Sequence, residues 1–200
     1  MGLLVILSAG AYASIQTYGP YSPAPPDLWD LDHYYWYKWG LNWSIPVGEE
    51  IIEATLKINN IYDTSHESSD KLRIHLLDNP PVGVISQWDG GNISGDRFKG
   101  NPLIGSFTDY SNYDDTPENL EYNFSTLGLI DELTAYAANG VFGFGFDPDC
   151  YYCHYKNSEI SFTITTEKAP VENPVPEPSG LLALAGGLTS IVGLAIRRRK

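Results

Sequence analysis

The sequence contains little sulfur and little positive charge. Two of its 200 residues are cysteines, Met1 is its one methionine, and 12 lysines and arginines stand against 25 aspartates and glutamates. The formal net charge of −13 argues against binding to nucleic acids or anionic lipid surfaces, because an acidic surface repels both. The absence of a second cysteine pair argues against a structural zinc site built from thiolates.

Known catalytic motifs are also absent. The sequence has no G-x-S-x-G nucleophile elbow, no H-E-x-x-H and no glycine-rich phosphate loop. Carboxylates are plentiful, but the sequence does not place two of them on either side of a cleft, as glycoside hydrolysis requires. We therefore expect a protein without catalytic activity.

An apolar segment lies close to the C-terminus. Residues 180–196 are 17 uncharged residues, and Arg197-Arg198-Arg199-Lys200 follows them. A helix of this length just crosses a bilayer core, and basic residues remain on the cytoplasmic side. We expect a single membrane-spanning helix, with all preceding residues outside the membrane.

Residues 176–200 resemble the bacterial PEP-CTERM sorting signal. The match has three consecutive parts, which are Pro176-Glu177-Pro178, a short apolar helix with small residues, and the basic end. The resemblance implies recognition by an exosortase-type membrane protease at the Pro-Glu-Pro triplet. It also implies transient anchoring in the inner membrane, removal of the helix, and display at the cell surface or release. The alternative is a plain tail anchor after a proline-rich stalk.

The first 13 residues predict an export signal peptide. The apolar run begins at Gly2 and ends in Ala11-Tyr12-Ala13, the small-residue motif that precedes signal-peptidase cleavage. We expect cleavage after Ala13. No cationic residue precedes the run, and a truncated gene would explain this departure from the usual signal peptide. The alternative is that these residues form a hydrophobic first strand.

Residues 14–166 predict one all-β domain, an antiparallel and jelly-roll-like β-sandwich. Apolar residues alternate with polar ones in short segments, which Gly-, Pro-, Asp- and Asn-rich turns separate. The predicted strands are residues 52–58, 72–76, 120–124, 142–146 and 160–164, and two further ones at 34–45 and 97–108.

Two segments depart from this period-two pattern. Apolar residues recur at helical spacing over 128–139, which predicts one short helix that closes an end of the sandwich and stops at Asn139-Gly140. The proline-containing residues 167–175 predict an extended linker. The segments 51–56, 76–78 and 142–150 are also similar to sandwich domains of exported PEP-CTERM proteins, a resemblance that implies no particular activity.

The segment Cys150-Tyr151-Tyr152-Cys153-His154 matches C-x-x-C-H, the attachment sequence of c-type haem. Export permits this chemistry, with His154 as one axial ligand and another histidine as the second. The motif lies between two predicted strands, whereas haem attachment usually opens a helix. We favour a disulfide between Cys150 and Cys153, which an oxidising exterior also favours.

Two Asp-x-Asp pairs, Asp30 with Asp32 and Asp147 with Asp149, indicate a structural calcium site. Ca²⁺ takes six to eight oxygen ligands, and loops of a sandwich often supply them. The residues after Asp147 lack the glycine and glutamate of an EF-hand loop. The alternative is that these carboxylates cap turns and remain in solvent.

Aromatic residues crowd residues 34–43. Alternation places Tyr35, Tyr37 and Trp39 on one face of the predicted strand and Tyr34 and Trp36 on the other. Sugar-binding proteins stack pyranose rings on exposed aromatic faces, and our candidates for this role are Tyr35, Tyr37 and Trp39. One of the two sets should be buried in the core, which is the competing explanation.

These observations predict an exported, exosortase-sorted and non-catalytic protein of the cell surface or extracellular matrix, associated with exopolysaccharide or biofilm. The alternative is a carbohydrate-binding module that uses exposed aromatic residues. A c-type haem protein is a third hypothesis. The expected partners are an exosortase-type protease and an extracellular polysaccharide.

Overall fold

The computed structural model describes residues 13–65, 70–89, 95–109, 116–150 and 152–168. The sorting signal at 176–200, the linker from residue 169 onward and the signal peptide up to residue 12 lie outside these residues. Within the described part of the chain, no helix is both long enough and apolar enough to span a bilayer.

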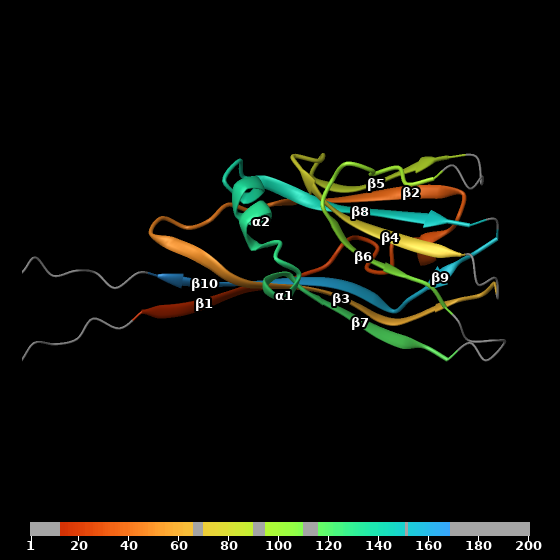
Figure 1. Cartoon of the computed structure of the whole chain (residues 1–200), viewed down its shortest axis with the longest axis horizontal. Helices are drawn as coiled ribbons and strands as arrows, with labels where there is room; N and C mark the ends of the chain where they lie inside the picture. Colours follow the sequence, from red (N-terminus) through yellow and green to blue (C-terminus); the bar gives the residue numbers. More distant parts are fainter. Residues whose placement is uncertain (1–12, 66–69, 90–94, 110–115, 151, 169–200) are drawn as a thin grey trace, which may run out of the picture. The chain divides into compact units, whose positions relative to one another are not determined.

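Two antiparallel sheets form the domain (Figure 1). The first sheet has the order β1-β10-β3-β7, and the short strand β9 pairs with the end of β3. The second sheet has the order β5-β2-β8-β4-β6. The bounds of the first sheet are β1 (Ser14–Tyr21), β3 (Glu49–Asp63), β7 (Glu118–Asn123), β9 (Tyr155–Lys156) and β10 (Glu159–Lys168). Those of the second are β2 (Tyr35–Asn42), β4 (Lys71–Asp78), β5 (Gly83–Trp88), β6 (Leu103–Phe107) and β8 (Val141–Asp149).

The core lies between the two sheets and is rich in phenylalanine. Phe142, Phe144 and Phe146 alternate with glycines along β8, and all three are fully buried. Phe144 meets Phe162 of the opposite sheet with a distance of 4.8 Å between ring centroids. Edge-to-face ring pairs of this kind add about 0.5–1.5 kcal/mol to the stabilisation from burial alone. The predicted alternation in residues 142–146 and 160–164 is therefore confirmed.

The predicted helix is present as α2 (Ile130–Ala137), after a single turn of helix, α1 (Phe124–Leu127). Leu133 and Ala137 of α2 are fully buried, and α2 contacts strands of both sheets. Phe124 begins α1 instead of ending a strand, because the side chain of Asn123 accepts a hydrogen bond from the Thr126 N–H and caps the turn.

The sequence pattern missed β1 and β5. Both are edge strands with mostly exposed residues, so no apolar alternation marks them. The strand predicted from residue 97 begins only at Leu103, after a loop at 95–102. β10 continues to Lys168, which pairs with Glu49, so residues 167 and 168 belong to a strand and not to the predicted linker.

Candidate functional site

The outward side of β8 has no side chains at its centre. Gly143 and Gly145 point away from the core, opposite the buried phenylalanines. A Cβ on Gly145 would lie 2.7 Å from the ring of Phe98, and one on Gly143 would lie 2.3 Å from the carbonyl oxygen of Trp39 and 2.8 Å from Pro80. The glycines therefore allow Phe98 and Pro80 to lie directly on the sheet.

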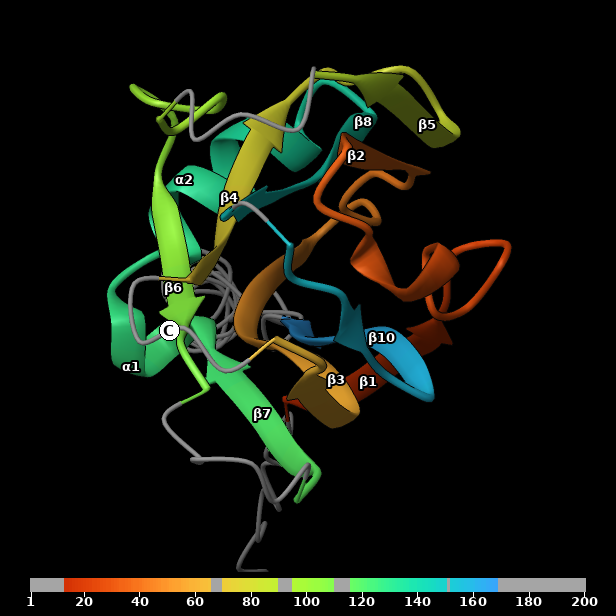
Figure 2. The same cartoon turned by 90° about the vertical axis from the view of Figure 1, so that its right-hand side faces the viewer.

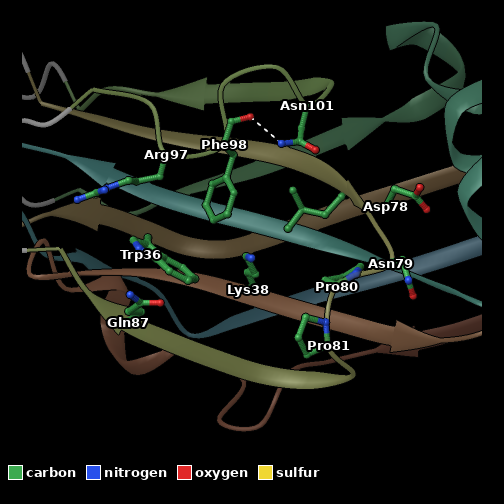
Figure 3. A pocket seen from close by; sticks show the side chains of 11 residues that line it. Trp36, Lys38, Asp78, Asn79, Pro80, Pro81, Gln87, Arg97, Phe98 and Asn101 are labelled. Carbon is green, nitrogen blue, oxygen red and sulfur yellow. Dashed lines mark hydrogen bonds between the residues drawn. The ribbon is translucent and has the colours of Figure 1, made fainter.

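A groove of about 460 Å³ lies on this outer face, and we call it the outer groove. Trp36 and Lys38 of β2 project into it, with Gln87 of β5 below them, as Figure 3 shows. The other side is formed by the 95–102 loop, the end of β4 and the residues that follow it, namely Arg97, Phe98, Asn101, Leu77, Asp78, Asn79, Pro80 and Pro81.

The outer groove combines one indole ring with cationic and amide groups. The Lys38 Nζ atom lies 5.1 Å from the centroid of the half-buried Trp36 ring, which also meets Phe98 edge-on at 5.8 Å. The guanidinium of Arg97 donates a hydrogen bond to the carbonyl oxygen of Asp89 at 3.3 Å. Such a surface offers an apolar face and several hydrogen-bond donors side by side.

Buried polar contacts hold the 95–102 loop against the sheet. Asp147 is 2% exposed and accepts a hydrogen bond from the backbone N–H of Arg97 at 2.9 Å. Burial raises the pKa of Asp147 to about 6, although that hydrogen bond acts to lower it. His75 lies with its Nε2 atom 3.1 Å from Asp96 Oδ1 and its Nδ1 atom 3.1 Å from the carbonyl oxygen of Asn101.

Two of the three predicted sugar-stacking residues, Tyr37 and Trp39, lie on the inner face of β2, so the prediction is wrong for them. Tyr37 is 1% exposed and Trp39 is 3% exposed, because they pair with Phe146 and Phe144 and belong to the core. They cannot present a ring face to an external sugar. Tyr35 is half-buried and lines a second, smaller hollow of about 320 Å³ together with Trp29, Asp32, Tyr37 and Ser86. Once the inward face of β2 is known, the alternation indicates that Trp36 lies on the outward face.

The structure does not gather the four aspartates that we predicted as calcium ligands. No three of them reach within 4.8 Å of one another. Asp147 bonds to the 95–102 loop, Asp149 pairs with Arg73, and Asp32 lies beside His33. The calcium prediction from the Asp-x-Asp spacing was wrong. Alternate residues of β8 project in parallel along an extended strand, so their carboxylates do not converge on one point.

Cys150 and Cys153 form a disulfide with their Cα atoms 5.8 Å apart, as the pattern predicted. Both residues are buried, and the bond uses both sulfur atoms. His154 follows immediately and is 39% exposed. Its Nε2 atom lies 3.7 Å from Asp32 Oδ1, a neighbour that is 122 positions away in the chain.

A buried aspartate at the end of β3 was not predicted. Asp63 is 1% exposed and accepts hydrogen bonds from the backbone N–H groups of Ser65 at 3.0 Å and His154 at 3.2 Å. Burial raises the pKa of Asp63 to about 6. Its place two residues after the buried Ile61 on an alternating strand was a signal that it points inward.

No known protein family matches this sequence, and no curated protein matches it either. A function must therefore be argued from the geometry of the domain and from the sequence of its two ends.

Proposed function

We propose that this chain is an exported polysaccharide-binding protein without catalytic activity, and that the outer groove is its binding site. One observation carries the proposal, which is that Trp36 lines an open groove together with the cations Lys38 and Arg97. Sugar rings stack on aromatic faces through their C–H groups, while neighbouring polar groups bind their hydroxyls and fix their orientation.

The charged residues of the outer groove indicate which class of polysaccharide it would bind. The chain carries a formal net charge of −13, yet two cations and one carboxylate, that of Asp78, line this surface, so cations are in excess there. A polysaccharide with carboxylates at intervals could pair with Lys38 and Arg97 there, while the acidic remainder of the surface would repel it. We therefore expect uronate-containing chains to bind better than neutral ones.

The two ends of the sequence support an extracellular place of action. Residues 1–13 have the pattern of a signal peptide, and Pro176-Glu177-Pro178 with residues 180–196 and the basic end resembles an exosortase sorting signal. A disulfide is typical of exported proteins. We propose transient inner-membrane anchoring through a helix at 180–196, followed by display in the exopolysaccharide matrix. We also propose, as the sequence led us to expect, that the strands of the sandwich are connected in a jelly-roll-like order.

Affinity electrophoresis through gels that contain a uronate polysaccharide or a neutral glucan tests the proposal. The wild-type chain should be retarded, and Trp36→Ala should weaken binding at least about tenfold, which corresponds to about 1.4 kcal/mol. Trp29→Ala is the matched control, because Trp29 is an exposed tryptophan that lines the smaller hollow.

The two variants separate the two hollows. Loss of retardation in Trp29→Ala but not in Trp36→Ala would place sugar binding in the smaller hollow. Equal mobility of the wild-type chain in gels with and without any of the polysaccharides would refute a sugar-binding function.

A further inference from the structure

We propose that Asp32, His33 and His154 form a binding site for a divalent transition-metal ion such as Zn²⁺. One ligand atom from each residue lies within 4.8 Å of those from the other two. Asp32 Oδ1 is 3.2 Å from His33 Nδ1 and 3.7 Å from His154 Nε2. This site is separate from the outer groove and does not depend on the proposed sugar binding.

The distances between the ligand atoms suit a metal ion with tetrahedral coordination. Two ligand atoms that each lie 2.0–2.1 Å from such an ion are roughly 3.3 Å apart. The two distances from Asp32 Oδ1 bracket this value, and the two imidazole nitrogens lie within 4.8 Å of each other, so side-chain movements would bring all three atoms into one coordination sphere. Two imidazoles and one carboxylate suit Zn²⁺ and its neighbours, whereas Ca²⁺ prefers an all-oxygen set.

His33 is a buried imidazole whose polar atoms the chain satisfies only in part. The residue is 4% exposed, and its Nδ1 atom lies near two acceptors, Asp32 Oδ1 and the carbonyl oxygen of Cys153 at 3.1 Å. A single N–H can point well at only one of them, while a metal ion could be bound by both the ring and the carboxylate. The Nε2 atom has no hydrogen-bond partner among the described residues.

The backbone holds the ligands in place. Asp32 and His154 form an isolated antiparallel bridge, and the His33 N–H donates to the Cys153 carbonyl oxygen at 3.2 Å. The disulfide and the bond from the His154 N–H to Asp63 fix the other strand of this contact. Figure 2 shows the segment before β2 beside the segment that leads into β9. Such preorganisation lowers the cost of binding.

The site is open on one side. His154 is 39% exposed and Asp32 is 26% exposed, so an ion can reach the ligands from solvent. Three protein ligands leave a fourth position for water, as in open zinc sites.

His75 provides a matched control within the same domain. It also has a carboxylate oxygen, of Asp96, at 3.1 Å and a backbone carbonyl, of Asn101, at 3.1 Å. No second histidine completes a group of three ligands around it in the described part of the chain. The two sites differ in the presence of His154 and in the ring atoms involved, because Asp96 faces Nε2 and Asn101 faces Nδ1 of His75, whereas both acceptors face Nδ1 of His33.

Isothermal titration of the oxidised full-length protein in detergent with Zn²⁺ tests the proposal. We expect one ion per chain, and Co²⁺ should give the intense visible absorption of a tetrahedral site. His154→Gln and Asp32→Asn should each weaken Zn²⁺ binding by at least about tenfold, since even outer-shell changes cost 10- to 100-fold. His75→Gln should leave the affinity unchanged, and circular dichroism checks the folding of each variant.

Two results would overturn the metal site. One is unchanged Zn²⁺ affinity in a folded His154→Gln or Asp32→Asn variant. The other is binding that appears only after reduction of the disulfide, which would assign the ion to Asp70, Cys150 and Cys153, whose ligand atoms also lie within 4.8 Å of one another. A thiol assay before titration distinguishes the oxidised from the reduced protein.

Discussion

The two faces of the β5-β2-β8-β4-β6 sheet use aromatic residues in opposite ways. On the inner face, Tyr37 and Trp39 pack against the phenylalanines of β8 and are almost fully buried. On the outer face, Trp36 is half-buried beside Lys38, and the neighbouring strand β8 has glycines at its two central outward positions. The inner face is packed with aromatic side chains, whereas the outer face carries the outer groove.

The difference shows how one strand can contribute to the core and to a surface groove at once. Alternation sends successive side chains of β2 to opposite faces, so the same aromatic run supplies a core and a groove wall. The outward Gly143 and Gly145 contribute to the groove by omitting side chains, which lets Phe98 and Pro80 form its surface. Changes on the two faces should therefore have different consequences.

Trp39→Ala should have the largest effect. Removing a 3% exposed indole leaves a cavity, and large-to-alanine changes of this kind cost about 3–5 kcal/mol. Trp36→Ala should cost less than about 1 kcal/mol, since its ring is not enclosed. Urea unfolding followed by fluorescence measures both, and equal losses would contradict the assignment of the two faces.

Gly145→Ala should be next in size. The new Cβ would lie 2.7 Å from the Phe98 ring, so the 95–102 loop must move away from the sheet. We expect a loss of about 1–3 kcal/mol and a parallel loss of polysaccharide binding. Adding Phe98→Ala should recover part of the stability lost by Gly145→Ala, because it removes the clash. Additive losses in the double variant would show that the two residues do not meet.

The pH dependence of stability tests the buried carboxylate beneath the outer groove. The pKa of Asp147 is about 6 in the folded protein, above its ordinary value of 3.8. Its protonated form therefore favours folding, fully below about pH 4, and this contribution is lost as the pH rises through about 6.

Asp147→Asn should remove a pH-dependent part of about 2 kcal/mol from the free energy of unfolding between pH 4 and pH 7. Urea midpoints of the wild-type and variant proteins at several pH values measure the difference. Parallel curves would mean that Asp147 titrates normally in the folded protein. Asp63→Asn offers an independent comparison, since burial raises the pKa of Asp63 to about 6 as well.

Lys38→Ala should have the smallest effect on stability. Its side chain lies over the Trp36 ring at the surface, so we expect a change within about 0.5 kcal/mol. Binding to a uronate polysaccharide should weaken severalfold and lose much of its salt dependence. Unchanged binding over a range of salt concentrations would argue against pairing of this cation with the polysaccharide.

The alternation of apolar and polar residues was sufficient to predict the strands that bury one face. The alternation in residues 52–58, 72–76 and 142–146 predicted β3, β4 and β8, because each of these strands faces the core. The edge strands β1 and β5 gave no such signal, since their pairing is made by backbone groups and requires few apolar side chains. The disulfide was predicted from the expected oxidising exterior, whereas the cysteine spacing by itself also matched a haem-attachment motif.

The candidate sites depended on contacts between distant residues. His33 and His154 are 121 positions apart, and the backbone contacts of residues 32–33 with residues 153–154 bring the centroids of their rings to 5.5 Å. The Asp-x-Asp pairs were close in sequence, yet they do not converge on one point. Proximity in sequence was therefore a poor guide to the ligand sets.

The amino-acid sequence by itself determined that the domain is built from antiparallel strands with two chemically different faces, and that its ends resemble export and sorting signals. Only the tertiary structure decided which aromatic face is buried, where the outer groove lies and which histidines meet. The physical reason is that alternation is a local property of each strand. The choice of inward face and the meeting of distant loops depend on how the two sheets pack against each other.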